Sequence, residues 1–137
     1  MSLGRAAAFV IHPVTGWALC GATIGAGMAT TTMENTLRIH AVAAPVIFIV
    51  LSLIYHRNFG HTGPLKPAVL FTAIVMFLDV FVVALAIYHS LVMFESVLGT
   101  WIPFALIFLS TYLTGLFAVN RRAPDTSAIP ARSSARD

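Results

Sequence analysis

Residues 67–89 read PAVLFTAIVMFLDVFVVALAIYH, an apolar run whose only charged residue is Asp79. About 20 apolar residues in a helix cross the roughly 30 Å hydrocarbon core of a bilayer, so this run is long enough to span a membrane. The apolar stretches of the chain predict spans at about 12–30, 33–56, 67–90 and 100–119. The sequence therefore predicts an all-α integral membrane protein with four transmembrane helices in an antiparallel bundle.

The composition excludes the other broad classes of protein. The chain is 58% hydrophobic and 9% charged, whereas an average soluble domain is about 25% charged. So few charges would not cover a water-soluble fold, and so much apolar material is foreign to disordered chains. The net charge of +3 does not indicate nucleic acid, because the basic residues flank the apolar segments instead of forming a face. The lipid bilayer is the expected environment.

The chain divides into one domain and a tail. Residues 1–122 are expected to form the transmembrane domain, and residues 123–137, which are polar and lack apolar periodicity, a flexible cytoplasmic tail. Arg5 and the apolar residues after it resemble a signal peptide. Pro13 and Gly16 interrupt that run, however, and apolar residues then continue to Met28, so the first span is expected to be retained.

The basic residues predict the orientation. With four spans, the termini and the 56–66 loop share one side of the membrane. That side holds Arg5, Arg57, Lys66, Arg121, Arg122, Arg132 and Arg136, and the other holds Arg38. The positive-inside rule places the basic side in the cytoplasm. The run GTWIPFAL at 99–106 is typical of a bacterial inner-membrane protein, so we expect the cytoplasmic (inner) membrane with both termini cytoplasmic.

Two helix starts are marked by local signals. Thr31 and Glu34 have the spacing of a capping box, in which each side chain binds a backbone amide of the other's turn. Glu34 and Arg38 are four residues apart and can pair on one helix face. Thr100 is the predicted N-cap of the fourth helix, with Pro103 in the first turn, where its missing N–H costs little.

Asp79 is the main candidate for a functional residue. A carboxylate at the centre of a bilayer costs about 2.5–3.5 kcal/mol on insertion scales, so such residues normally face a bundle interior or water. At 100° per residue the least apolar stripe of the third helix consists of Thr72, Asp79, Ala86 and Ser90. Asp79 is therefore predicted to face inward as a proton or cation site. The alternative is a packing role, with a hydrogen bond to a backbone carbonyl or to Thr15, Thr23 or Tyr112.

A second group of polar residues is predicted at the opposite face of the membrane. Two imidazoles and two carboxylates, those of His40, His89, Glu34 and Glu95, suit zinc, iron or copper if they converge. A single haem between His40 and His89 is the related possibility. His56 lies about 160° around the second helix from His40, so a two-haem arrangement is disfavoured. The identity of any cofactor stays open.

Small residues and one proline are predicted to govern helix packing. Gly21 and Gly25, with Ala22 beside them, lie at helical spacing and permit close backbone approach within the chain or to a second copy. Pro45 removes one backbone bond inside the second helix and is expected to kink it.

No catalytic motif or cofactor-binding loop is present in the sequence, so an enzymatic role is not favoured. The first hypothesis is a small proton- or cation-linked transporter or channel-like protein, which at this size would act as an oligomer. The second is a haem- or metal-binding membrane redox protein. The third is a non-catalytic membrane subunit or scaffold that binds a partner membrane protein.

Overall fold

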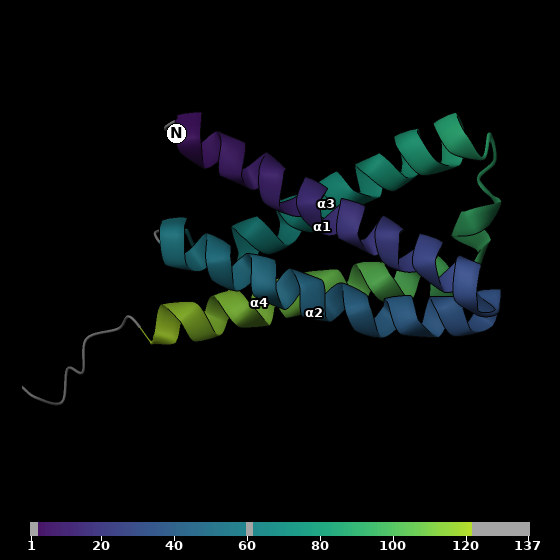
Figure 1. Ribbon diagram of the computed structural model, residues 1–137. Coiled ribbons are helices and arrows are strands. Elements are labelled where there is room, and N and C mark those ends of the chain that lie inside the picture. Colours follow the sequence, from purple (N-terminus) through teal and green to yellow (C-terminus); the bar gives the residue numbers. More distant parts are fainter. Residues whose placement is uncertain (1–2, 60–61, 122–137) are drawn as a thin grey trace, which may run out of the picture.

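The computed structural model describes residues 3–59 and 62–121, which form four helical spans (Figure 1). The first two are α1 (Leu3–Thr30) and α2 (Met33–Phe59). The third is α3 (Leu65–Leu78) continued by the π-helix η1 (Asp79–Ile87). After the 3-10 turn η2 (Val92–Glu95), the fourth begins with the π-helical η3 (Val97–Trp101) and continues as α4 (Ile102–Asn120).

All four spans are long and apolar enough to cross a membrane, and the described residues contain no strand. This confirms the predicted all-α fold with four helices. The predicted tail, 123–137, lies outside the described residues. The first helix begins at Leu3, earlier than the predicted 12, and passes through the buried Pro13. Neighbouring helices can support a proline inside a membrane helix, so Pro13 does not end α1.

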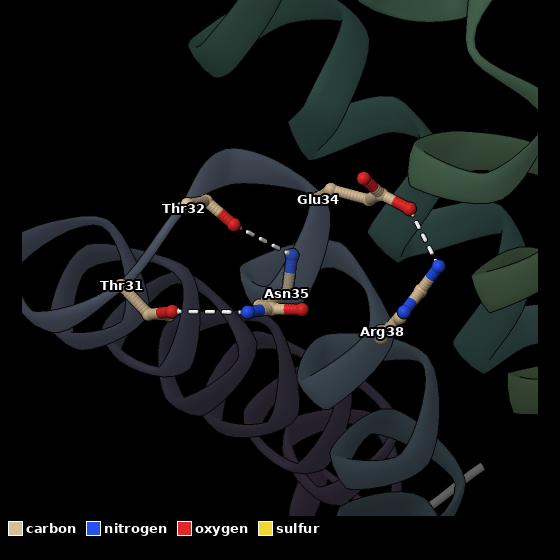
Figure 2. Close-up of polar contacts among 5 residues, drawn as sticks. All are labelled: Thr31, Thr32, Glu34, Asn35 and Arg38. Carbon is tan, nitrogen blue, oxygen red and sulfur yellow. Dashed lines mark hydrogen bonds and ion pairs between the residues drawn. The ribbon is translucent and has the colours of Figure 1, made fainter.

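The N-terminus of α2 differs from the predicted capping box by one residue. Thr32 is the cap: its Oγ1 accepts the backbone N–H of Asn35 at 3.4 Å, while the side-chain amide of Asn35 donates to Thr31 at 3.3 Å. Glu34 does not reach back, because it forms the predicted ion pair with Arg38 (Figure 2). The predicted box is therefore wrong, and the pair is confirmed.

The fourth span also starts earlier than its predicted cap. Ser96 caps η3 by accepting the backbone N–H of Gly99 at 3.0 Å. Thr100, the predicted cap, is buried one turn inside and donates to the carbonyl of Met93 at 2.7 Å. Pro103 does lie in the first turn of α4, as predicted.

The helices surround a common core in the order α1, α2, α4, α3, with each helix packed on two neighbours. The start of α1, the end of α2, the start of α3 and the end of α4 lie at one end of the bundle, at the left of Figure 1. We call this the basic end, because Arg57, Lys66 and Arg121 lie there. The opposite end holds the α1–α2 turn and the segment that links η1 to η3.

The inner face of α2 is buried at every fourth residue. It consists of Thr36, His40, Ala44, Phe48, Ser52 and His56. Four residues are close to one turn of an α-helix, so these side chains form one stripe, which faces α1 and α4. Large apolar side chains instead cover the outside of the bundle, among them Phe77, Phe81 and Ile87, as expected of a surface that faces lipid.

Aromatic rings join three helices at the basic end. The ring of Tyr55 lies 5.1 Å from that of Phe9 and 5.7 Å from that of Phe71, measured between centroids. His12 is stacked on Phe71 at 6.3 Å, and its Nδ1 is 2.9 Å from the Ala8 carbonyl. Offset and edge-to-face contacts of this kind contribute about 0.5–1.5 kcal/mol each beyond burial. The cluster therefore fixes the spacing of α1, α2 and α3.

Candidate functional site

Asp79 lies inside the third span, where its carboxylate faces α1. The indole Nε1–H of Trp17, half-way along α1, donates to its Oδ1 at 2.8 Å. Both side chains are half-buried. The bond joins residues 62 positions apart in the sequence and bridges two helices that cross near mid-length (Figure 1). It is therefore a contact between spans at membrane depth.

Asp79 is also the residue at which the third helix changes type. Its backbone N–H still reaches the carbonyls of Val75 and Met76. Beyond it the backbone hydrogen bonds join residues five positions apart, as in the 3.0 Å bond from the Tyr88 N–H to the Val83 carbonyl. Segments of π-helix are uncommon and occur frequently at functional sites. The carboxylate thus lies at a local irregularity of the backbone.

This change of helix type corrects the predicted polar stripe. The stripe assumed 100° per residue along the whole helix, which holds only as far as Leu78. In η1 the fully buried residue is Ala84, five positions after Asp79, whereas Ala86 is exposed. A π-helix has more residues per turn than an α-helix. The residue that faces inward after Asp79 is therefore the fifth one along, Ala84, and not the seventh, Ala86.

Asp79 has no cationic partner within the described part of the chain. The one ion pair found there is that of Glu34 and Arg38, whose side chains are mostly exposed. Two of the predicted packing partners of Asp79 are placed elsewhere: Thr23 donates to the Leu19 carbonyl at 2.9 Å, and Thr15 is exposed. A contact of Asp79 with Tyr112 stays a prediction. Sequence reasoning missed Trp17. An indole N–H inside an apolar span needs an acceptor, and this requirement was the available signal.

The four predicted metal ligands are not gathered at one point. His40 is buried at 6% exposure, and its Nδ1 has no hydrogen-bond partner. His89, Glu34 and Glu95 are exposed, and Glu34 is occupied by Arg38. Among residues 3–59 and 62–121, no three His, Cys, Asp or Glu side chains could hold one metal ion. A haem bound through His40 and His89 stays a prediction.

The predicted packing residues of α1 face outward. A Cβ added at Gly21 or Gly25 would meet nothing within 4 Å, and Ala22 is exposed. The close approaches of α1 to α2 occur instead at Gly16, against Phe48, and at Gly27, against Thr36. Pro45 lies inside α2; the kink that it is expected to cause stays a prediction.

Comparison with known proteins gives no relative. No protein-family model, no curated protein and no solved structure matches this chain.

Proposed function

We propose that this protein is a small proton- or cation-linked transporter or channel-like protein of the bacterial inner membrane, and that it acts as a homo-oligomer. The observation that carries the proposal is Asp79. It is an acid inside an apolar span, at the start of a π-helix, with a single neutral hydrogen-bond donor, Trp17. A carboxylate in this setting can take up and release a proton or contact a cation.

The energies argue against packing as the sole role of Asp79. A carboxylate at the bilayer centre costs about 2.5–3.5 kcal/mol. Hydrogen bonds between membrane helices return about 0.6 kcal/mol on average and about 1.7 kcal/mol at most in double-mutant cycles. The bond from Trp17 therefore does not offset the cost of the acid, and an apolar residue would pack more favourably. A transport role explains why an acid stands at this position, and packing does not.

The surface of the single chain supports the oligomeric part of the proposal. One pocket is a mainly apolar groove of about 730 Å³, lined by Thr23 and by side chains of α2 between 38 and 47. It lies on the outside of the bundle and does not include Asp79. We propose that a second copy helps to enclose the path. The exposed Gly21, Ala22 and Gly25 face of α1 would permit close approach of another helix.

The charge distribution supports cytoplasmic termini. Arg57, Lys66 and Arg121 lie at the basic end, whereas Arg38 at the opposite end is neutralised by Glu34. The positive-inside rule then orients the basic end toward the cytoplasm. A transported ion would therefore reach Asp79 from membrane faces that differ in charge.

Flux into proteoliposomes tests the proposal. Purified protein would be reconstituted into vesicles that contain a pH-sensitive dye, with proton, Na⁺ or K⁺ gradients imposed in turn. We expect Asp79→Asn to lower the active flux at least tenfold, because the amide keeps an acceptor for Trp17 but does not titrate. Glu34→Gln, which changes an exposed carboxylate, is the matched control and should keep the wild-type rate. A wild-type rate in Asp79→Asn would remove Asp79 as the carrier.

A second function is favoured by one observation, the buried Nδ1 of His40 without a partner. Buried polar atoms are normally hydrogen-bonded, so a haem on His40 would give this imidazole a role in a redox protein. The test is the visible spectrum and metal content of protein purified from cells supplied with iron and a haem precursor. A Soret band or bound metal that disappears in His40→Ala would support this function. Colourless, metal-free wild-type protein would exclude it.

A further inference from the structure

The hydrogen bond that Asp79 accepts leaves its second carboxylate oxygen for a proton. The indole Nε1–H of Trp17 donates to Oδ1 at 2.8 Å. A carboxylic acid keeps one oxygen as an acceptor and carries its proton on the other, so this bond fits both the ionised and the protonated form. A metal cation on Asp79 would instead lie close to the positive end of the indole N–H. The bond therefore favours a proton over a metal cation.

No second carboxylate stands beside Asp79 in the described part of the chain. Glu34 and Glu95 lie at the opposite end of the bundle. The titratable side chains described on α1 and α4, which pack against the third span, are those of His12, Cys20, Tyr112 and Arg121. Potassium channels replace the water around the ion with rings of oxygen atoms, whereas a proton needs one basic oxygen. A single carboxylate is thus better suited to a proton.

Thr72 lies between the basic end and Asp79, on the same face of the third span. It is seven positions after Leu65, where α3 begins, and seven positions before Asp79. Seven residues make nearly two turns and rise about 10 Å, so the side chains of Thr72 and Asp79 leave the helix in the same direction. The Oγ1 atom of Thr72 is buried. Its hydroxyl is therefore a polar group half-way between the start of α3 and the acid.

The hydroxyl of Thr72 is not bonded to its own helix, unlike those of several other threonines. Four of these donate to the carbonyl four residues earlier, at 2.7–2.9 Å: Thr23, Thr30, Thr36 and Thr114. The Oγ1 atoms of Thr72 and Thr111 are buried and have no hydrogen-bond partner. Buried polar atoms are normally bonded to protein or to ordered water. The Thr72 hydroxyl is thus a point at which water can bind inside the bundle.

We propose that the ion carried by this protein is a proton, and that it reaches Asp79 from the basic end along water bound at the Thr72 hydroxyl. Hydrogen-bonded oxygens lie about 2.8 Å apart, so a few waters cover the roughly 10 Å on either side of Thr72. A hydroxyl both donates and accepts and can pass a proton along such a chain. The proposal rests on the proposed transport function and names its ion and route.

The transfer leaves one change of charge, at Asp79. The water next to the carboxylate gives one proton to Oδ2 and receives one from the water at Thr72. The carboxylate becomes a neutral acid, while its Oδ1 still accepts the N–H of Trp17. Release toward the opposite end returns the carboxylate to its charged form.

Ion flux into proteoliposomes tests the ion and the route together. We expect a pH gradient to drive flux, and gradients of Na⁺ or K⁺ at equal pH to drive none. Thr72→Val removes the hydroxyl and keeps the shape of the side chain. Proton flux should fall about tenfold, the effect of losing one buried hydrogen bond at the point of transfer. Thr72→Ser restores a hydroxyl and should return the flux close to the wild-type rate.

Thr114→Val is the matched control, because Thr114 is buried too, but its hydroxyl donates to the Ser110 carbonyl at 2.7 Å. This variant should keep the wild-type flux. Thr72→Val breaks no hydrogen bond between protein atoms, so its unfolding midpoint should not fall below that of the wild type. A loss of flux at an unchanged midpoint is then not a loss of fold.

A second measurement follows the proton without net transport. The infrared band of a protonated carboxyl shifts when its proton is exchanged for deuterium, and the band of Asp79 is identified by its loss in Asp79→Asn. We expect exchange in heavy water to slow about tenfold in Thr72→Val, for the same reason as the flux. Exchange in Thr114→Val should match the wild type.

The outcomes distinguish the proton route from the transport function. Flux of Na⁺ or K⁺ that requires Asp79 would keep the transport function and overturn the proton as its ion. Equal proton flux in Thr72→Val and the wild type would overturn the route. If no ion is carried, the transport function fails and the exchange measurement decides. Slower exchange in Thr72→Val then supports a proton route to Asp79, and equal exchange overturns it.

Discussion

At the scale of single residues, the hydrogen bond from Trp17 to Asp79 is the contact with the clearest expected consequence. We expect Trp17→Phe and Asp79→Ala to show a coupling free energy of about 0.6–1.7 kcal/mol, between the average and the maximum found for hydrogen bonds between membrane helices. The measurement is a double-mutant cycle on unfolding in mixed micelles. Because the two atoms lie 2.8 Å apart, strictly additive effects would show that this bond does not form in the folded protein.

Local residue patterns were predictable, and distant partners were not. The spacing of Glu34 and Arg38 predicted their ion pair, because residues four apart on a helix lie on one face. The insertion cost of a carboxylate singled out Asp79. Its partner Trp17 lies 62 residues away, and helical periodicity carries no information on which faces of two helices meet. The cap of α2 was misplaced because Thr31 and Thr32 are adjacent and equally suited to capping.

At the scale of elements, the α1–α2 contact depends on Gly16 and Gly27. Composition alone does not distinguish these two glycines from Gly21 and Gly25, which are exposed. A Cβ at Gly16 would lie 2.6 Å from the ring of Phe48, which is fully buried and has no room to move. We expect Gly16→Ala to destabilise the protein by about 1–3 kcal/mol through overpacking. Gly21→Ala, in open space, should be neutral or stabilising by up to about 1 kcal/mol.

Thermal or detergent unfolding of the two variants, compared side by side, measures this difference. Equal stability of the Gly16 and Gly21 variants would mean that α1 does not approach α2 at Gly16. The same pair bears on assembly. If a second copy packs on the exposed face of α1, Gly21→Ala should weaken the oligomer while leaving the monomer fold intact.

The π-helix η1 gives a second expectation at this scale. Ala84 is fully buried and Ala86 is exposed, whereas a continuous α-helix would place Ala86 on the face of Asp79. We expect Ala84→Leu to cost about 1–3 kcal/mol by overpacking and Ala86→Leu to change stability by less than about 0.5 kcal/mol. Unfolding midpoints of the two variants measure this. The reverse order would indicate that the third span stays α-helical beyond Asp79.

The sequence did not predict η1, because an apolar run such as 80–87 fits an α-helix and a π-helix equally well. The choice depends on packing against other spans and on the turn that follows, where His89 adopts a positive φ of 50°. The same limit applies to the ends of the fourth span. Ser96 lies outside the apolar run, so hydropathy did not mark it as the cap.

At the scale of the whole molecule, span length and apolar composition were sufficient to predict four membrane helices. These properties depend on the solvent and not on tertiary contacts, since a bilayer offers no water to bond the backbone and a helix bonds its backbone within its own segment. The order in which neighbouring helices pack, α1, α2, α4, α3, could not be predicted from the sequence. It depends on the meeting of particular faces, such as Tyr55 with Phe9 and Phe71.

The placement of Asp79 between the two faces of the membrane depends on four crossings with the basic end in the cytoplasm. Labelling of single cysteines by a membrane-impermeant maleimide tests this directly. Cys20→Ser, at the single native cysteine, provides the background. Cysteines would then be placed at Asn58 and Lys66 on the basic end, and at Asn35 and Glu95 on the opposite end. All four positions are exposed and should label after solubilisation.

In spheroplasts with an intact inner membrane, we expect Asn35→Cys and Glu95→Cys to label. Asn58→Cys and Lys66→Cys should label only after the membrane is disrupted. Labelling of the basic-end cysteines from outside would reverse the orientation, and different behaviour of Asn58→Cys and Lys66→Cys would contradict the four-span arrangement itself.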